Sequence, residues 1–159
     1  MTLDELGTFG MARMDDDEIR GFLGARGVAI LGFPTDGAPY LLPLSYGYDG
    51  DQTLYFTYVL GAESRKDDLT AAADQVTALV YSAESKYNWE SVTMTGHLTE
   101  LPEEEWAANE EVIAGAWRPD LFERASAESE VRVYAYHIED WSGIKHTGLP
   151  PGFADAGGE

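Results

Sequence analysis

The amino-acid sequence predicts a mainly β protein, a six-stranded antiparallel barrel with peripheral helices. Six short segments carry strand patterns, and helical patterns occur only between some of them. The size of the chain agrees, because 159 residues that are 44% hydrophobic are enough for one domain around one core. We expect a lead-in over residues 1–14, the barrel domain over 15–146 and a flexible tail over 147–159.

The chain begins with a lead-in and a short amphipathic helix. Residues 1–14 have no firm hydrophobic period, so we expect a loose segment there. The acidic run 15–18 supplies an N-cap and a negative first turn. Hydrophobic residues then recur at helical spacing, and Gly27 stands where the helix would end. We therefore expect a helix over about residues 16–26.

Three strands follow and should form an antiparallel meander. They are expected over residues 28–33, 40–46 and 53–58, separated by turns that contain Gly37 and Gly50. Pro43 has no N–H to donate to a ladder, so the second strand should be interrupted there or lie at an edge.

The second half of the chain should supply two helices and three strands. A helix over about 65–73 precedes a strand over about 75–82. The clearest alternation lies in 91–101, and a further helix should begin at Pro102 and end before Pro119. The buried face of the alternating strand is expected to consist of Val92, Met94, Gly96 and Leu98. A last strand over 131–138 closes the barrel.

The charge is far from neutral, with 29 acidic and 10 basic residues and a net charge of −19. Such a field repels nucleic acid and anionic membranes, so we expect neither as a partner. A cationic partner is one interpretation of this charge. We favour the other, a strongly solvated acidic surface adapted to a salt-rich cytoplasm, where ions screen the self-repulsion.

The same sequence indicates a cytoplasmic protein without metal. It has no cysteine, no run of 18 apolar residues and no basic n-region at its start. The histidines at 97, 137 and 146 do not have metal-ligand spacing. Common nucleotide, hydrolase and zinc-protease motifs do not occur, and the many carboxylates single out no acid–base pair. No catalytic residue can be assigned.

One short motif stands out against the acidic background. Ser64-Arg65-Lys66 contains the only two adjacent basic residues of the chain, and it opens a predicted helix. A helix N-terminus offers free N–H groups, and a hydroxyl with two cations would complete a cradle for a phosphate. The alternative is that both bases are solvated and pair with neighbouring acids such as Asp67 or Asp68.

The order of motifs around this pair resembles a known family. The strand 38–46 begins with Ala-Pro-Tyr, the strand 54–57 ends in Phe-Thr, Ser-Arg-Lys opens a helix, and 89–98 carries a valine and a glycine four residues apart. This set resembles the FMN-binding split-barrel family related to pyridoxamine 5'-phosphate oxidase, in its shorter, nitroimidazole-resistance-like branch. The resemblance implies an FMN-binding split barrel and a homodimer with two FMN sites at the subunit interface.

The resemblance also implies roles for particular residues. Arg65 and Lys66 would hold the flavin phosphate, with help from Ser64 and Thr57. The segment 43–46 would run along the isoalloxazine, and Ser91 with Trp89 would reach the flavin of the other subunit. The cofactor-binding residues expected in this way are Pro43, Leu44, Ser45, Tyr46, Thr57, Ser64, Arg65, Lys66, Trp89 and Ser91.

The expected activity is an FMN-dependent oxidoreductase acting on a small molecule. The C-terminal substrate motif of pyridoxamine 5'-phosphate oxidase is not recognisable here, so its substrate is not expected. One alternative is the same fold binding a deazaflavin, or haem with His97, His137 or His146 as axial ligand. Another is a flavin- or ligand-binding module without turnover. Aromatic residues between 40 and 58 could stack on a flavin or, as strand spacing favours, fill the core.

Overall fold

The computed structural model describes residues 10–60, 65–115 and 130–147. The elements in chain order are β1 (Met11–Met14), α2 (Asp16–Ala25), β2 (Val28–Phe33), β3 (Tyr40–Tyr48), β4 (Thr53–Leu60), α3 (Arg65–Ala72), β5 (Val76–Ser85), β6 (Asn88–Leu101), α4 (Glu103–Trp106), the 3₁₀ turn η2 (Ala107–Asn109), α5 (Glu110–Gly115) and β7 (Glu130–His146). No helix within the described ranges is long and apolar enough to cross a membrane.

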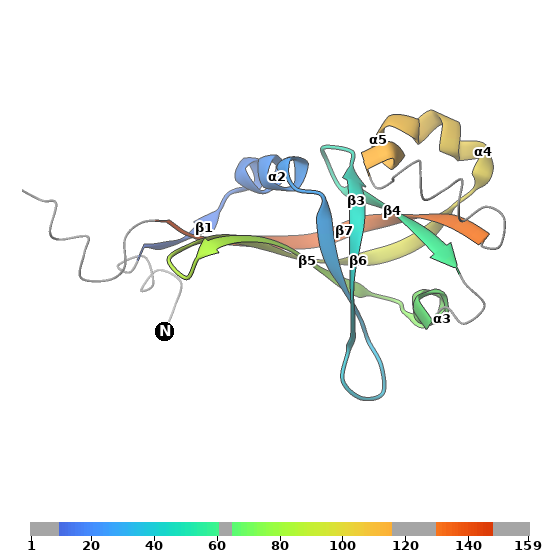
Figure 1. The fold of residues 1–159 in the computed structure, drawn as a ribbon, viewed down its shortest axis with the longest axis horizontal. Coiled ribbons are helices and arrows are strands. Elements are labelled where there is room, and N and C mark those ends of the chain that lie inside the picture. The colour runs from blue at the N-terminus through green and yellow to red at the C-terminus, as the bar shows by residue number, and fades with distance from the viewer. Residues whose placement is uncertain (1–9, 61–64, 116–129, 148–159) are drawn as a thin grey trace, which may run out of the picture.

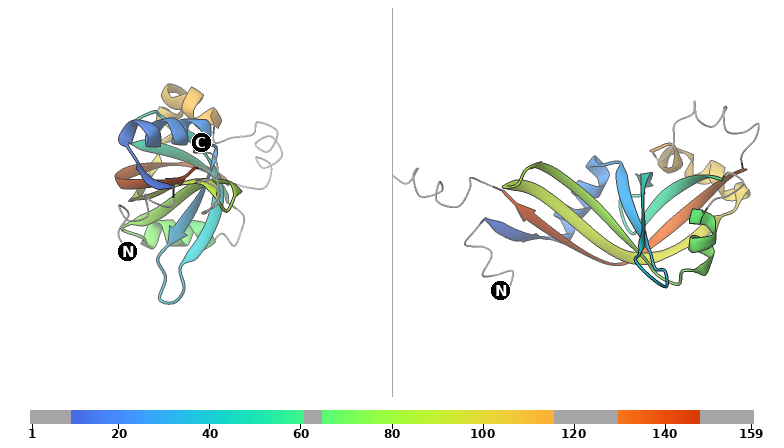
Figure 2. Two further views of the ribbon diagram at one scale, coloured as in Figure 1. Left: turned by 90° about the vertical axis from the view of Figure 1, so that its left-hand side faces the viewer. Right: turned by 60° about the horizontal axis from the view of Figure 1, so that its bottom comes forward.

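Six antiparallel strands close into a barrel, as the sequence predicts (Figures 1 and 2). Their order is β7-β4-β3-β2-β5-β6, and pairing of β6 with β7 completes the circle. The seventh strand, β1, lies outside this circle and pairs only with the end of β7. The 17-residue β7 is therefore the common support of β1, β4 and β6.

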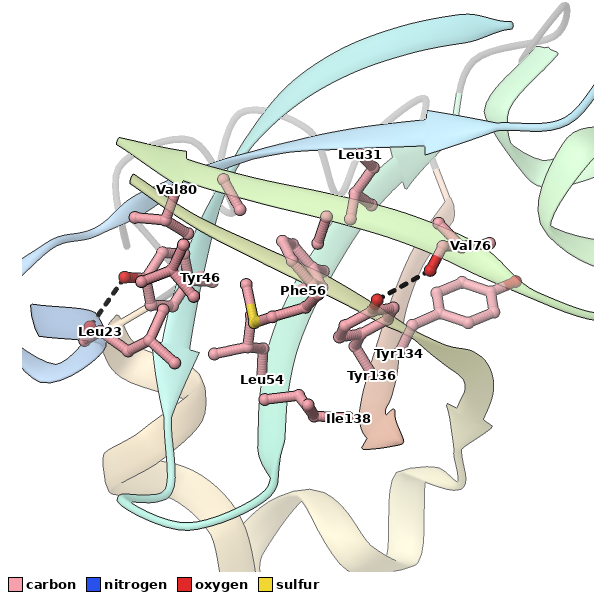
Figure 3. Packing of buried hydrophobic residues seen from close by; sticks show 14 of the residues in the cluster. Leu23, Leu31, Tyr46, Leu54, Phe56, Val76, Val80, Tyr134, Tyr136 and Ile138 are labelled. Atoms are coloured by element: carbon pink, nitrogen blue, oxygen red, sulfur yellow. Dashed lines mark hydrogen bonds between the residues drawn. The ribbon is translucent and has the colours of Figure 1, made fainter. Parts of the chain in front are cut away.

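The core fills the interior of the barrel (Figure 3). Alternate residues of each strand point inward, which is why Val92 and Met94 are buried while Thr93 between them is exposed. Two fully buried tyrosines carry their hydroxyls into this interior. Tyr136 donates a hydrogen bond of 2.7 Å to the carbonyl of Val76, and Tyr58 shares one of 2.9 Å with the hydroxyl of Thr70 in α3.

Helix α2 packs against the barrel through the three apolar residues that its sequence pattern predicts. Ile19, Phe22 and Leu23 are buried, and Asp15 forms a capping box with Glu18. The Glu18 carboxylate also forms an ion pair with Lys145 of β7. The indole of Trp141, also in β7, donates to the Asp16 carboxylate at 2.9 Å. The helix is thus attached to β7 by polar contacts at its first turn.

Three expectations differ from the structure. The last strand, expected over 131–138, continues to His146 in β7. Residues 11–14 form β1 instead of a loose segment; four residues are too few to show a period, and the strand depends on its partner β7. A Cβ at Gly143 would lie 2.8 Å from Met14, so the glycine makes room for β1. The single helix expected after Pro102 is broken into α4, η2 and α5. Pro119 and the tail beyond 147 lie outside the described residues.

Candidate functional site at the split between β3 and β4

The barrel is held together unevenly, because β3 and β4, like β2 and β5, pair at only three positions. The β3–β4 pairs are Tyr46 with Phe56, Gly47 with Tyr55 and Tyr48 with Leu54. Beyond them β3 continues as a partner of β2 alone, and β4 as a partner of β7 alone. Figure 1 shows the two strands diverging on leaving their shared turn. We call the opening between residues 40–45 of β3 and 57–60 of β4 the split.

Backbone groups of β3 point into the split. The N–H of Tyr46 donates to the carbonyl of Gly27 at 2.9 Å, so the even-numbered residues of β3 direct their backbone groups toward β2. The odd-numbered residues therefore direct theirs toward β4, and those within 40–45, Pro43 and Ser45 among them, have no ladder partner there. Pro43 lies at such an edge, as expected for a residue without an N–H.

Thr57 faces Ser45 across the split. Extending the register of the three pairs places these two residues opposite each other, and both belong to the alternating set that points out of the barrel. The Thr57 hydroxyl is buried and has no hydrogen-bond partner in the described part of the chain. A buried hydroxyl without a partner costs roughly 1–3 kcal/mol, so it would gain from an acceptor brought by a ligand.

Helix α3 brings a cation to the other end of the split, beside Tyr40, which lies about 17 Å along β3 from Ser45. It begins at Arg65, just beyond β4, and the Tyr58–Thr70 hydrogen bond fixes it to that strand. The Arg65 guanidinium carbon lies 4.6 Å from the ring centroid of Tyr40, which belongs to β3 on the other side of the split. No ion pair joins Arg65 to Asp68 or to any other carboxylate whose side chain the structure describes. Lys66 follows Arg65 in α3, and Ser64 lies outside the described residues.

The side chains of Leu44 and Tyr46 do not face the split. Leu44 packs against the core, and Tyr46 is 2% exposed with its hydroxyl donating 2.7 Å to the carbonyl of Leu23. Burial raises the pKa of Tyr46 above its ordinary value. Phe56 and Tyr58 are also fully buried, so these aromatic residues serve the core, the interpretation that strand spacing favours. Within 43–46, only backbone groups and the outward side chains of Pro43 and Ser45 can meet a ligand.

Ser91 and Trp89 lie apart from the split within one chain. Both are in β6, where Ser91 pairs with Tyr81 of β5 and the Trp89 ring stacks on His146 at 6.2 Å. In the strand order β6 is three places from β3, a separation on the order of 14 Å. The structure therefore places Pro43, Ser45 and Thr57 along the split and Arg65 at its end beside Tyr40, and leaves Trp89 and Ser91 outside this group.

An apolar outer face next to the split was not expected from the sequence. Its most exposed members are Leu41 at 63%, Val28 at 56% and Tyr81 at 56%. The face also includes the outward residues Ile30, Pro43 and Leu79 of β2, β3 and β5. The available signal was the continuous apolar run of β2, because strands covered on both faces lack polar alternation.

The histidines lie elsewhere. His97 and His137 pair across β6 and β7, two seams away from the split in the strand order, with ring centroids 4.9 Å apart. His97 Nδ1 is 2.8 Å from the Glu139 carboxylate, and His137 Nε2 is 2.9 Å from the Thr99 hydroxyl. Within the described ranges, no group of three or more potential ligands is arranged to hold a metal ion.

The sequence profile of a family described as pyridoxamine 5'-phosphate oxidase matches residues 15–145. The chain belongs to the pyridoxamine 5'-phosphate oxidase family. The match covers the barrel and its helices, and so confirms the resemblance drawn from the strand motifs. This member of the pyridoxamine 5'-phosphate oxidase family is also 27% identical over 101 residues to the uncharacterized protein RA0666 of Rhizobium meliloti (strain 1021), 64% of the length of each chain.

Solved structures show the same fold as this pyridoxamine 5'-phosphate oxidase family member. A FAD-binding protein (mll6688) from Mesorhizobium loti is 24% identical with a TM-score of 0.67, over 87% of this chain and 98% of that one. A putative 5-nitroimidazole antibiotic resistance protein from Bacteroides thetaiotaomicron is 20% identical with a TM-score of 0.63, over 86% of this chain and 89% of that one. At these identities the likeness establishes the split-barrel fold, and the ligand must be argued from the site.

Proposed function

We propose that this protein binds FMN at the split and is an oxidoreductase acting on a small molecule. The observation that carries the proposal is that Ser45, Thr57 and Arg65, from three different elements, border one opening in the barrel wall, with the cation at one end and the two hydroxyls at the other. Family membership and a FAD-binding protein among the structural relatives support a flavin as the ligand.

The residues present fit the parts of a flavin mononucleotide. Arg65, with Lys66 next to it in α3, supplies the positive charge for the phosphate, and the Thr57 hydroxyl supplies a donor that lacks a partner. The free backbone groups of Ser45 and Pro43 supply hydrogen bonds for the polar edge of the isoalloxazine. Bound flavin would supply the hydride chemistry, while the chain binds and orients it.

We further propose that the flavin lies at the interface of a homodimer. The apolar outer face borders the split, and its three large hydrophobic residues are each more than half exposed in the single chain. A second copy related by a two-fold axis would cover this face. It would also allow Ser91 and Trp89 of each chain to approach the flavin held by the other, which one chain alone does not allow.

Removal of the phosphate anchor tests the flavin proposal. The double variant Arg65→Ala/Lys66→Ala should purify without the visible absorption of flavin and should not quench FMN fluorescence. The control Arg13→Ala/Arg20→Ala removes two positive charges from β1 and α2 and should retain flavin. A double variant that purifies fully loaded would contradict the proposed anchor. Mass spectrometry of the released cofactor identifies FMN or FAD, and reduction by NADH or NADPH distinguishes an oxidoreductase from a carrier.

A charge placed on the apolar face tests the dimer. Tyr81→Glu should convert a dimer into a monomer in analytical ultracentrifugation and should release the flavin, because the site would be incomplete. Ala12→Glu adds the same charge to an exposed position of β1 and should change neither. A monomeric Tyr81→Glu protein that still holds stoichiometric flavin would show that the site does not need the second copy.

A further inference from the structure

We propose that Tyr40 is a positioning residue for the phosphate anchor and thereby favours phosphorylated flavins over riboflavin. Its ring would hold the Arg65 guanidinium at the mouth of the split before the ligand arrives. This inference rests on the proposed flavin site and adds a residue that does not itself touch the phosphate.

The contact is the closest of its kind in the described structure. Arg65 lies 4.6 Å from the centroid of the Tyr40 ring, whereas Arg20, Arg26 and Lys86 lie 5.2–5.3 Å from the rings beneath them. Two of those contacts are local, Arg26 with Phe22 at the end of α2 and Lys86 with the adjacent Tyr87, and the third joins Arg20 of α2 to Trp141 of β7. The Arg65 contact instead joins the two sides of the split, since Tyr40 begins β3 and Arg65 begins α3 after β4.

Tyr40 is a rigid support. It pairs with Phe33 of β2, and the two rings lie 6.3 Å apart at 43°. Phe33 is fully buried, so Tyr40 is packed against the barrel core while Arg65 lies over its ring. Arg65 by contrast is exposed, and a free arginine side chain loses roughly 2 kcal/mol of rotamer freedom when it is fixed. Contact with a rigid ring reduces that loss on binding.

Stacking on the Tyr40 ring also leaves the Arg65 guanidinium able to bind a phosphate. A cation–π contact uses the face of the guanidinium, whereas its five N–H donors lie in its plane. Those donors stay available for two phosphate oxygens, the bidentate geometry that arginine favours. The aromatic contact therefore orients Arg65 without competing for its hydrogen bonds, which a carboxylate partner would do.

The effect should be confined to ligands with a phosphate. An exposed cation–π contact corresponds to a two- to five-fold change in affinity, so Tyr40→Leu should weaken FMN binding by roughly that factor. Riboflavin has the same isoalloxazine and no phosphate, so its affinity should not change. Tyr40→Phe keeps the ring face and should bind FMN as the wild type does.

The experiment titrates FMN and riboflavin, by flavin fluorescence, into the apo forms of the full-length wild type, Tyr40→Phe, Tyr40→Leu, Arg65→Ala and Tyr40→Leu/Arg65→Ala. Tyr40→Leu should weaken FMN binding in the wild type and have no further effect when Arg65 is alanine. If the Tyr40→Leu variant is unfolded at the temperature of the titration, Tyr40→Met replaces it, because methionine also removes the aromatic ring.

Three results would overturn this inference alone. If Tyr40→Leu weakened the binding of FMN and of riboflavin equally, Tyr40 would act on the shape of the flavin site and not on the phosphate. If the effects of the two substitutions on FMN affinity were additive in the double variant, Tyr40 would not act through Arg65. If Tyr40→Leu bound FMN as tightly as the wild type, Tyr40 would not position Arg65, and the proposed flavin site would be unaffected by that result. A wild-type protein that fails to bind FMN, or that binds riboflavin equally well, would refute the phosphate anchor and this inference together.

Discussion

Replacement of Tyr46 by phenylalanine should lower stability without affecting flavin binding. The change removes one oxygen, which donates 2.7 Å to the carbonyl of Leu23 from a side chain that is 2% exposed. Leu23 lies in the last turn of α2, where carbonyls lack a helical donor, so the loss leaves a buried acceptor without its partner. We expect the free energy of unfolding to fall by about 2 kcal/mol and the Tm by about 6 °C.

The chain offers a matched control two residues further along β3. The hydroxyl of Tyr48 also donates 2.7 Å to a backbone carbonyl, that of Asp51, but in an exposed turn. Tyr48→Phe should change stability by less than about 0.5 kcal/mol. Urea unfolding followed by far-UV circular dichroism gives both values, and flavin titration gives the affinities. The reasoning fails if the two variants are equally stable, or if Tyr46→Phe loses flavin while keeping its Tm.

Other predictions concern packing, protonation and salt. Gly47→Ala should destabilise by at least about 2 kcal/mol in urea unfolding, because its Cβ would lie 1.7 Å from the carbonyl oxygen of Val112 in α5. The control Gly37→Ala meets nothing within 4 Å and should be neutral. Burial and the neighbouring His97 lower the pKa of His137 below 6.5. The folded state therefore binds fewer protons than the unfolded state as the pH falls through 6.5, so stability should begin to fall on acidification below about pH 7, and His137→Gln should reduce the slope. Because the net charge is −19, added KCl should raise the Tm by screening self-repulsion, and a Tm that falls with salt would contradict this.

The strand alternation predicted most of the barrel, because inward residues of a half-buried strand must be apolar. Val76, Ala78 and Val80 show this in β5, and the acidic run before α2 correctly located its N-cap at Asp15. Local patterns failed where structure depends on a distant partner. Strand β1 exists because Gly143 of β7 leaves room for Met14, a relation that no short window contains.

The candidate site was predictable in part for the same reason. Adjacent bases in an acidic chain drew attention to Arg65, and strand motifs located Thr57 and the 43–46 segment. Which residues of that segment face outward depends on register, so Leu44 and Tyr46 could not be separated from Pro43 and Ser45 by sequence alone. The contact between Tyr40 and Arg65 crosses the split and requires knowledge of how far β3 and β4 remain paired.

Because β3 pairs with β4 over only three positions, some backbone N–H groups of β3 are hydrogen-bonded to a neighbouring strand and others have no strand partner. The N–H groups of Leu42 and Leu44 are held by β2, whereas those of Leu41 and Ser45 have no strand partner on the other side. Exchange with deuterated solvent should therefore be slow at Leu42 and Leu44 and fast at Leu41 and Ser45. A molecule that fills the split would act as a missing length of sheet, and its binding energy would add directly to the free energy that keeps the barrel folded.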